Sequence, residues 1–254
     1  MIYKSSQFEL DPHIHTVVSG HSWSTLGECA DRAIEVGLKG ICITEHSCST
    51  PNGPPDFIPE PAARLPRVYK GLRIYKGLEA NIIDRDGKLD TPDKYLQYLE
   101  FCIASVHRFS YTGQNIEENT GAMLGALDNV YVDMIGHPDG PAAPCDLTEI
   151  VMATKKHNKI VEINNCSFNG HRGDCSENLK KIVQLCKKHD VRMCVSSDSH
   201  FHMMVGDFDL ACEFLTEMHV PLELILNYDI KAFDAYIKER KVYREEHSEL
   251  LNRE

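Results

Sequence analysis

The 254-residue sequence has no long apolar run, and this argues against two classes of protein. No stretch approaches the ~18 consecutive apolar residues of a membrane-spanning helix. The first ten residues, MIYKSSQFEL, lack the apolar core of roughly 7–15 residues that a secretory signal peptide contains. We therefore expect a cytoplasmic protein that does not associate with membranes.

The sequence also lacks paired cysteines, since its ten cysteines include no CxxC motif. They are scattered through apolar segments, unlike the cysteine framework of a short secreted domain. We interpret them as mostly buried, reduced thiols that contribute to packing.

Basic residues are fewer than acidic ones. The sequence has 27 Lys and Arg residues and 38 Asp and Glu residues, so its formal net charge is −11. A long basic groove for nucleic acid is therefore disfavoured, and nucleic acid is an unlikely partner. A small anionic substrate could still bind if several bound divalent cations reversed the potential locally. The sequence also allows a homo-oligomer.

Short apolar runs alternate with amphipathic stretches along the whole chain. This is the pattern of repeated βα units around a parallel sheet. The length and the 42% hydrophobic content suit one α/β barrel in a single domain. The seven strand-like runs are residues 8–13, 38–44, 73–80, 101–106, 132–136, 160–164 and 192–197.

Two stretches depart from this alternation. Residues 47–66 contain six prolines and are expected to form a long loop, with a lid over the barrel mouth as one interpretation. Residues 229–240 are expected to form a closing helix. The predicted barrel thus covers approximately residues 7–240, and residues 241–254 are expected to form a charged, frayed tail.

Nearly every predicted strand ends in a residue that can bind a metal ion. The ends of parallel barrel strands converge on one face, where the loops build the active site. Several imidazoles and carboxylates packed together would be costly without a partner, and metal ions are the natural one. The residues at or just beyond the strand ends are Asp11, His13, His15, His21, Glu45, His46, Glu79, His107, His137, Asn164, Asn165, Asp198 and His200.

The ligand chemistry narrows the choice of metal. His13 and His15 project to the same face of a strand and can hold one ion together. Imidazole combined with carboxylate suits zinc, iron or manganese. Four other histidines lie on predicted helices or in the tail and are interpreted as ordinary surface or core residues, namely His157, His189, His219 and His247.

Eight short motifs follow one another along the chain, namely DPHIHT, HSWST, ITEHS, GLEANI, SVHRF, GHPDG, EINNCSF and SDSH. With these motifs, residues 9–228 resemble the polymerase and histidinol phosphatase (PHP) family, most closely its YcdX-like phosphatase branch. The resemblance implies a distorted (βα)7 TIM-like barrel with three divalent metal ions at its mouth, usually zinc, with manganese or iron as alternatives.

The resemblance also assigns nine ligands. It implies one ion held by His13, His15, Glu79 and Asp198, and a second held by Glu79, His107 and His137, so that Glu79 bridges the two. The third ion would lie between His21, His46 and His200. Two positions depart from the family pattern without removing a ligand: Pro12 replaces a larger aliphatic residue, and Glu45 replaces a shorter aspartate.

The implied activity is metal-dependent hydrolysis of a small phosphate monoester. A hydroxide bridging two ions would attack the phosphorus atom, with Glu79 and Asp198 as the catalytic ligands. Arg172 and then Arg108 are the candidate phosphate contacts, because a guanidinium matches phosphate oxygens.

Four alternatives remain open from the sequence. Within enzymes, the chain could be a phosphodiesterase or exonuclease, or an enzyme like histidinol phosphatase. Outside enzymes, it could bind zinc without turnover, or bind no metal and use its histidines as a pH-sensitive interface.

Overall fold

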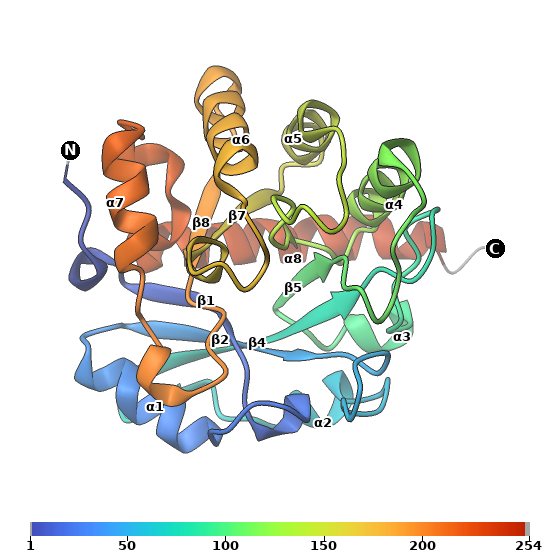
Figure 1. The fold of residues 1–254 in the computed structure, drawn as a ribbon. Coiled ribbons are helices and arrows are strands. Elements are labelled where there is room, and N and C mark those ends of the chain that lie inside the picture. The colour runs from blue at the N-terminus through green and yellow to red at the C-terminus, as the bar shows by residue number, and fades with distance from the viewer. Residues whose placement is uncertain (1, 252–254) are drawn as a thin grey trace.

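The computed structural model describes residues 2–251 and shows a nearly closed barrel of seven parallel strands (Figure 1). The first and last strands approach each other through a parallel bridge between Ile14 and Ser199. This confirms the predicted single α/β domain and its distorted barrel. In barrel order the strands are β1 Leu10–Ile14, β2 Gly40–His46, β4 Leu72–Asn81, β5 Phe101–Ser105, β6 Met134–Ile135, β7 Ile160–Asn164 and β8 Met193–Ser196.

Helices connect successive strands on the outside of the barrel. In Figure 1, α4 to α7 lie on one side of the strands, and α1 and α2 lie on the other. The residues on the inner faces of these helices pack against the strands in one large apolar core. The helices are α1 Leu26–Glu35, α2 Pro59–Ala62, α3 Asp93–Leu96, α4 Ile116–Asp128, α5 Leu147–Lys156, α6 Ser176–His189, α7 Asp209–Glu217 and α8 Ile230–Leu251.

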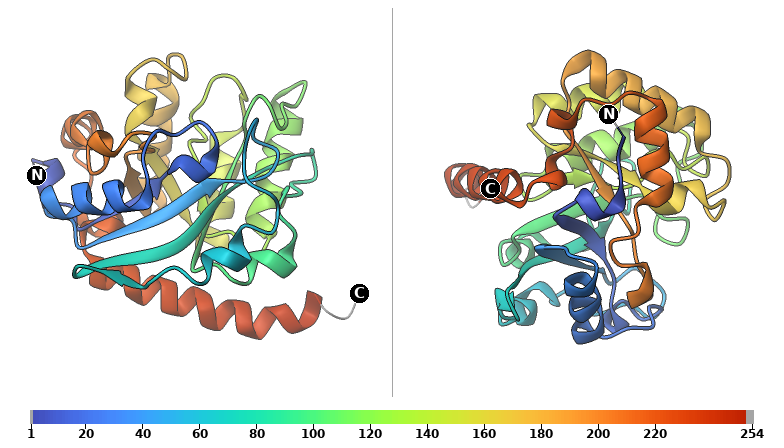
Figure 2. Two further views of the ribbon diagram at one scale, coloured as in Figure 1. Left: turned by 90° about the horizontal axis from the view of Figure 1, so that it is seen from below. Right: turned by 90° about the vertical axis from the view of Figure 1, so that its left-hand side faces the viewer.

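Helix α8 closes the end of the barrel at which the strands begin, and Figure 2 shows it at the edge of the molecule, apart from the other helices. Its Phe233 and Tyr236 join a second apolar cluster built from residues near the starts of the strands, such as Leu10, Tyr75 and Phe101. The opposite, C-terminal end of the barrel is therefore left for the functional site.

Helix α8 is longer than we predicted. We expected a helix over residues 229–240 and a frayed tail after it, whereas the helix continues to Leu251. Arg240 and Arg244 anchor it, since both are buried and both pair with the buried carboxylate of Asp133. Residues 252–254 of the predicted tail lie outside the described residues.

Three further details differ from the sequence-based expectation. The loop predicted at residues 47–66 contains the short helix α2, which begins at Pro59. A two-residue strand, β3 Val68–Tyr69, pairs antiparallel with β4. Strand β6 has two residues rather than five, and the carboxylate of Asp133, just before it, accepts hydrogen bonds from Arg240 and from the backbone N–H of Cys102.

The cysteines lie where we expected them. All ten are free, and seven are buried. Burial raises the pKa of the Cys166 thiol to about 12, so this residue, although near the barrel mouth, is held as a thiol. No helix among residues 2–251 combines the length and the apolar character needed to cross a bilayer.

Candidate metal centre

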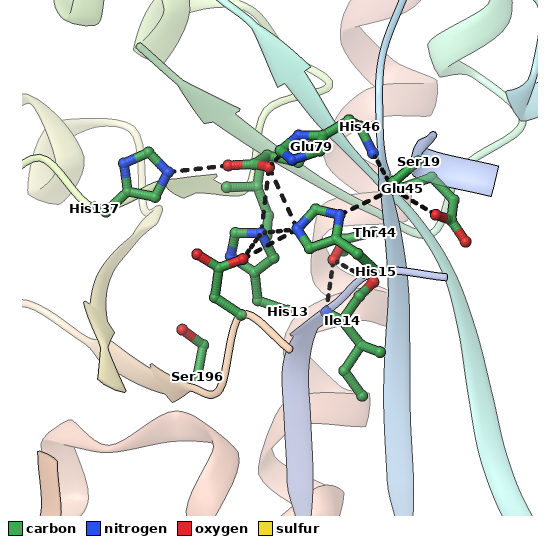
Figure 3. A network of polar contacts seen from close by, with 12 residues as sticks. His13, Ile14, His15, Ser19, Thr44, Glu45, His46, Glu79, His137 and Ser196 are labelled. Carbon is green, nitrogen blue, oxygen red and sulfur yellow. Dashed lines mark hydrogen bonds and ion pairs between the residues drawn. The ribbon is translucent and has the colours of Figure 1, made fainter. Parts of the chain in front are cut away.

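The structure brings the predicted ligands together at the C-terminal mouth of the barrel. Figure 3 shows His13, His15, His46, Glu79 and His137 among them. Strand pairing explains part of this, because His46 on β2 lies directly opposite Glu79 on β4. The remaining predicted ligands come from β1 and the loop after it, and from the residues just after β5, β6 and β8. Most of them are almost completely buried, whereas His21 is exposed and the side chain of His200 is 30% exposed.

Glu79 lies at the centre of the cluster and faces five histidines. Its Oε2 is 2.7 Å from His46 Nδ1, 3.4 Å from His13 Nε2 and 3.5 Å from His15 Nε2. Its Oε1 is 3.0 Å from His137 Nε2 and 3.3 Å from His107 Nε2. The two carboxylate oxygens thus face two different sets of imidazoles, which is the arrangement a bridging ligand needs.

Asp198 completes the first set. Its Oδ1 is 3.1 Å from His15 Nε2 and 3.6 Å from His13 Nε2, and these two imidazole nitrogens are 3.0 Å apart. Ligand atoms of His13, His15 and Glu79 lie within 4.8 Å of one another, and Asp198 Oδ1 lies beside the two imidazoles of this group.

The third set lies nearer the surface. His200 Nε2 is 3.0 Å from His21 Nε2, and the ring of His46 stacks on that of His21 with centroids 4.8 Å apart. His15 also borders this set, because ligand atoms of His15, His46 and His200 lie within 4.8 Å of one another.

The donor set fits divalent metal ions. Glu79 Oε2 and His46 Nδ1 are buried, yet neither has a hydrogen-bond partner among the described residues, although the two atoms are only 2.7 Å apart. Leaving such polar atoms unpaired is costly, and a cation held between them would satisfy both. Mixed imidazole and carboxylate ligands suit zinc, manganese or iron.

The pKa shifts of His15 and Glu79 favour the protonation states that metal ligands need, whereas that of His13 has the opposite sign. Burial lowers the pKa of His13, but the carboxylates of Glu162, Asp198 and Glu79 outweigh it and raise the pKa well above its usual range. Burial lowers the pKa of His15 well below its usual range, and the neighbouring His46 and His200 lower it further, so this imidazole is neutral. Burial opposes ionisation of Glu79, but adjacent imidazoles, His107 first among them, outweigh it and hold the pKa of Glu79 well below its usual range. The carboxylate is therefore ionised.

Two of the predicted ligands have unusual backbone conformations. His137 has φ of 28° and Asp198 has φ of 51°, in the left-handed region that residues with a side chain rarely adopt. Such conformations persist only where the surrounding structure imposes them, and they cluster at functional sites.

Our sequence reasoning missed Glu162, a buried carboxylate in β7. Its Oε1 accepts hydrogen bonds from His13 Nδ1 and Ser196 Oγ, both at 2.6 Å, and its Oε2 accepts one from the backbone N–H of His137 at 2.7 Å. It thereby orients one ligand of each of the first two sets. A charged residue inside the apolar run IVEIN was the signal that could have revealed it, because a buried charge needs a partner.

Other polar residues orient individual imidazoles. Asn81 Oδ1 lies 2.7 Å from His107 Nδ1, and Ser19 Oγ lies 3.1 Å from His15 Nδ1. Glu45, one of the two departures from the family pattern, accepts a hydrogen bond from Ser19 Oγ at 2.6 Å. Glu45 therefore acts on His15 through Ser19, which is the kind of outer contact that tunes a metal ligand.

The hydrogen bond from His13 to Glu162 gives a testable prediction. In Glu162→Gln the side-chain volume is kept, but one carboxylate oxygen becomes an NH2 group and the side chain loses its negative charge. We expect metal affinity to fall about 10–100-fold, the usual cost of losing such a partner. Competition with a chelator of known affinity measures this. Ser196→Ala, which keeps the contact between His13 and Glu162, should have a smaller effect, and equal effects would contradict the assignment.

The two predicted substrate contacts lie beside the cluster but differ in their surroundings. Arg172 forms an ion pair with Asp198 Oδ2, which also accepts a hydrogen bond from Asn164 Nδ2 at 3.0 Å. Arg108 is exposed, and its guanidinium forms no hydrogen bond or ion pair with a predicted ligand among residues 2–251. Both arginines line a cavity of about 480 Å³ that also borders His107 and His137.

Fold and site together define a barrel protein with a metal-capable centre at the C-terminal ends of its strands. The chain belongs to the PHP domain family, whose model matches residues 11–166.

The family's known members include close relatives of this chain. It is 40% identical over 235 residues to a probable phosphatase of Acetivibrio thermocellus. The alignment covers 92% of this chain and 97% of the relative. It is also 42% identical over 234 residues to a probable phosphatase of Clostridium novyi, and that alignment covers 92% of this chain and 96% of the relative.

A solved structure shares the fold at low sequence identity. It is the histidinol phosphate phosphatase of Lactococcus lactis complexed with zinc, L-histidinol and phosphate. The match has a TM-score of 0.58 and 22% identity, and it covers 84% of this chain and 94% of that one.

Proposed function

We propose that this protein is a metal-dependent phosphatase that hydrolyses a small phosphate monoester at a trinuclear site. The observation that carries the proposal is the position of Glu79, whose two oxygens face two separate groups of imidazoles. Its membership of the PHP family and its relatives, which are named probable phosphatases, support the same reaction class. We propose zinc as the resident metal because the histidinol phosphate phosphatase neighbour contains zinc.

The residues have separate roles in this proposal. The nine predicted ligands hold the ions, with Glu79 between the first two sets. Bound divalent ions of this kind lower the pKa of water and offset the negative charge of a phosphate. Arg172 is placed to donate hydrogen bonds to the phosphate oxygens, because its guanidinium already lies at Asp198, beside the first set of ligands.

Elemental analysis combined with an activity assay tests the proposal. Protein purified without added metal should contain about three divalent ions per chain and hydrolyse an aryl phosphate monoester, because the proposal assigns one ion to each of the three ligand sets. Chelation should abolish turnover, and zinc, manganese or iron should restore it. A chain that contains no metal and remains inactive after metal addition would contradict the proposal. Hydrolysis of a single-stranded oligonucleotide in preference to the monoester would favour the phosphodiesterase alternative.

A further inference from the structure

The cavity beside the cluster borders the second set of predicted ligands, because His107 and His137 line it. Three loops form most of its walls, namely residues 106–112 after β5, residues 137–143 after β6 and residues 171–173 after β7. Its volume of about 480 Å³ is within the usual range for small-molecule sites. A phosphate ester bound at the second ligand set would therefore have this space beside it for its leaving group.

The charge of this cavity is opposite to that of the whole chain. No aspartate or glutamate is among the residues that line it, although the chain carries a formal charge of −11. Asp139 is close in sequence but fully buried, so it presents no carboxylate oxygen to the cavity. The ionisable side chains that do line it are cationic or neutral, namely His107, Arg108, His137, His171 and Arg172.

Arg108 is the side chain in this wall that is available for a new ion pair. Arg172 is already paired with Asp198. The Arg108 guanidinium takes part in none of the hydrogen bonds or ion pairs found among residues 2–251, and it is exposed at the cavity. A guanidinium without a protein partner, facing a cavity without carboxylates, favours an anionic ligand.

We propose that the leaving group of the substrate carries a second anionic group, such as a carboxylate or a phosphate, that Arg108 binds in this cavity. This inference rests on the proposed phosphatase function and specifies its substrate class. Apolar side chains of Val106, Phe109 and Met123 complete the walls and can pack against the carbon skeleton of the leaving group. An amino alcohol such as histidinol, whose ammonium would need a carboxylate partner, is disfavoured.

Three aryl phosphates test this directly, because they share the 4-methylphenyl phosphate skeleton and carry on its methyl carbon a carboxylate, no further group or an ammonium. They are 4-(carboxymethyl)phenyl phosphate, 4-methylphenyl phosphate and 4-(aminomethyl)phenyl phosphate. For the metal-loaded wild-type protein we expect kcat/KM to be highest for the carboxylate and lowest for the ammonium compound. Arg108 should contribute about tenfold to the ratio between these two, the effect of one charge-assisted hydrogen bond.

Variants assign that ratio to Arg108. Arg108→Gln should lower the carboxylate-to-ammonium ratio about tenfold, and Arg108→Glu should lower it further because it reverses the charge. Arg67→Gln controls for net charge, since Arg67 is 71% exposed beside the start of β4, and it should keep the wild-type ratio.

The outcomes separate this inference from the function on which it rests. Hydrolysis of all three compounds with no preference, or with preference for the ammonium compound, would overturn the inference and leave the phosphatase proposal intact. The same holds if Arg108→Gln lowers kcat/KM equally for all three, because Arg108 would then act on the transferred phosphoryl group. Hydrolysis of none of them by metal-loaded protein would count against the phosphatase proposal itself.

Discussion

Replacing Glu79 by glutamine is expected to reduce kcat/KM for an aryl phosphate by roughly a thousandfold, the upper range for losing one electrostatic contact at a catalytic centre. Glutamine keeps the shape of the side chain but removes the negative charge that five imidazoles face. Because each carboxylate oxygen of Glu79 faces a different group of imidazoles, the substitution disturbs two ligand sets at once. The metal content measured by elemental analysis should therefore also fall.

The comparison needs a variant that loses a carboxylate elsewhere. Glu177→Gln is such a variant, because Glu177 is 85% exposed on α6 and its one ion pair within the described part of the chain is with Lys180, one helical turn away. It should keep wild-type metal content and activity. A Glu79→Gln protein with a full complement of metal and normal turnover would show that Glu79 is not a bridging ligand, provided that its circular dichroism spectrum and Tm match those of the wild type.

The second large effect is expected on stability, from Asp133→Asn at the closed end of the barrel. Asp133 is fully buried and pairs with Arg240 and Arg244, which anchor α8. Removing one partner of a buried ion pair leaves the other charge uncompensated and costs about 3–5 kcal/mol. We expect the free energy of unfolding to fall by this amount and Tm to fall by roughly 10 °C.

A change on the same helix provides the control. Glu239 is exposed on α8 and contacts Asn158, so Glu239→Gln should change the free energy of unfolding by less than about 0.5 kcal/mol. Asp133 lies at the opposite end of the strands from the metal centre. The Asp133→Asn protein should therefore keep its metal content when it is assayed well below its Tm. Denaturant unfolding that shows equal stability for Asp133→Asn and wild type would mean that the two arginines find other partners.

Much of the fold follows from the sequence because the barrel strands are short apolar runs bounded by polar loops. The predicted runs at 73–80 and 160–164 correspond to β4 and β7 almost residue for residue. The end of α8 was misjudged because its last turns are highly charged, and Arg240 and Arg244 are stabilised by a distant partner, Asp133. Periodicity does not record such a contact.

The predicted metal ligands could be found from the sequence, whereas the residues that orient them could not. The strand ends indicated a larger group of candidate residues, from which the resemblance selected the nine predicted ligands. Parallel strands bring such residues together regardless of sequence separation. The residues that orient them are set by side-chain geometry across strands. Glu162 reaches His13 from β7, and Asn81 reaches His107 from the end of β4. Neither contact has a sequence spacing that would reveal it.

The closure of the barrel between β1 and β8 has a consequence for biosynthesis. His13 lies on the first strand, whereas Asp198 and His200 follow the last one, so ligands of the first and third sets come from both ends of the barrel sequence. A growing chain that has left the ribosome only through β7 already displays His13, His15 and Glu79 but lacks Asp198. Metal loading of the first and third predicted sets should therefore follow translation of β8, because Asp198 and His200 emerge only then.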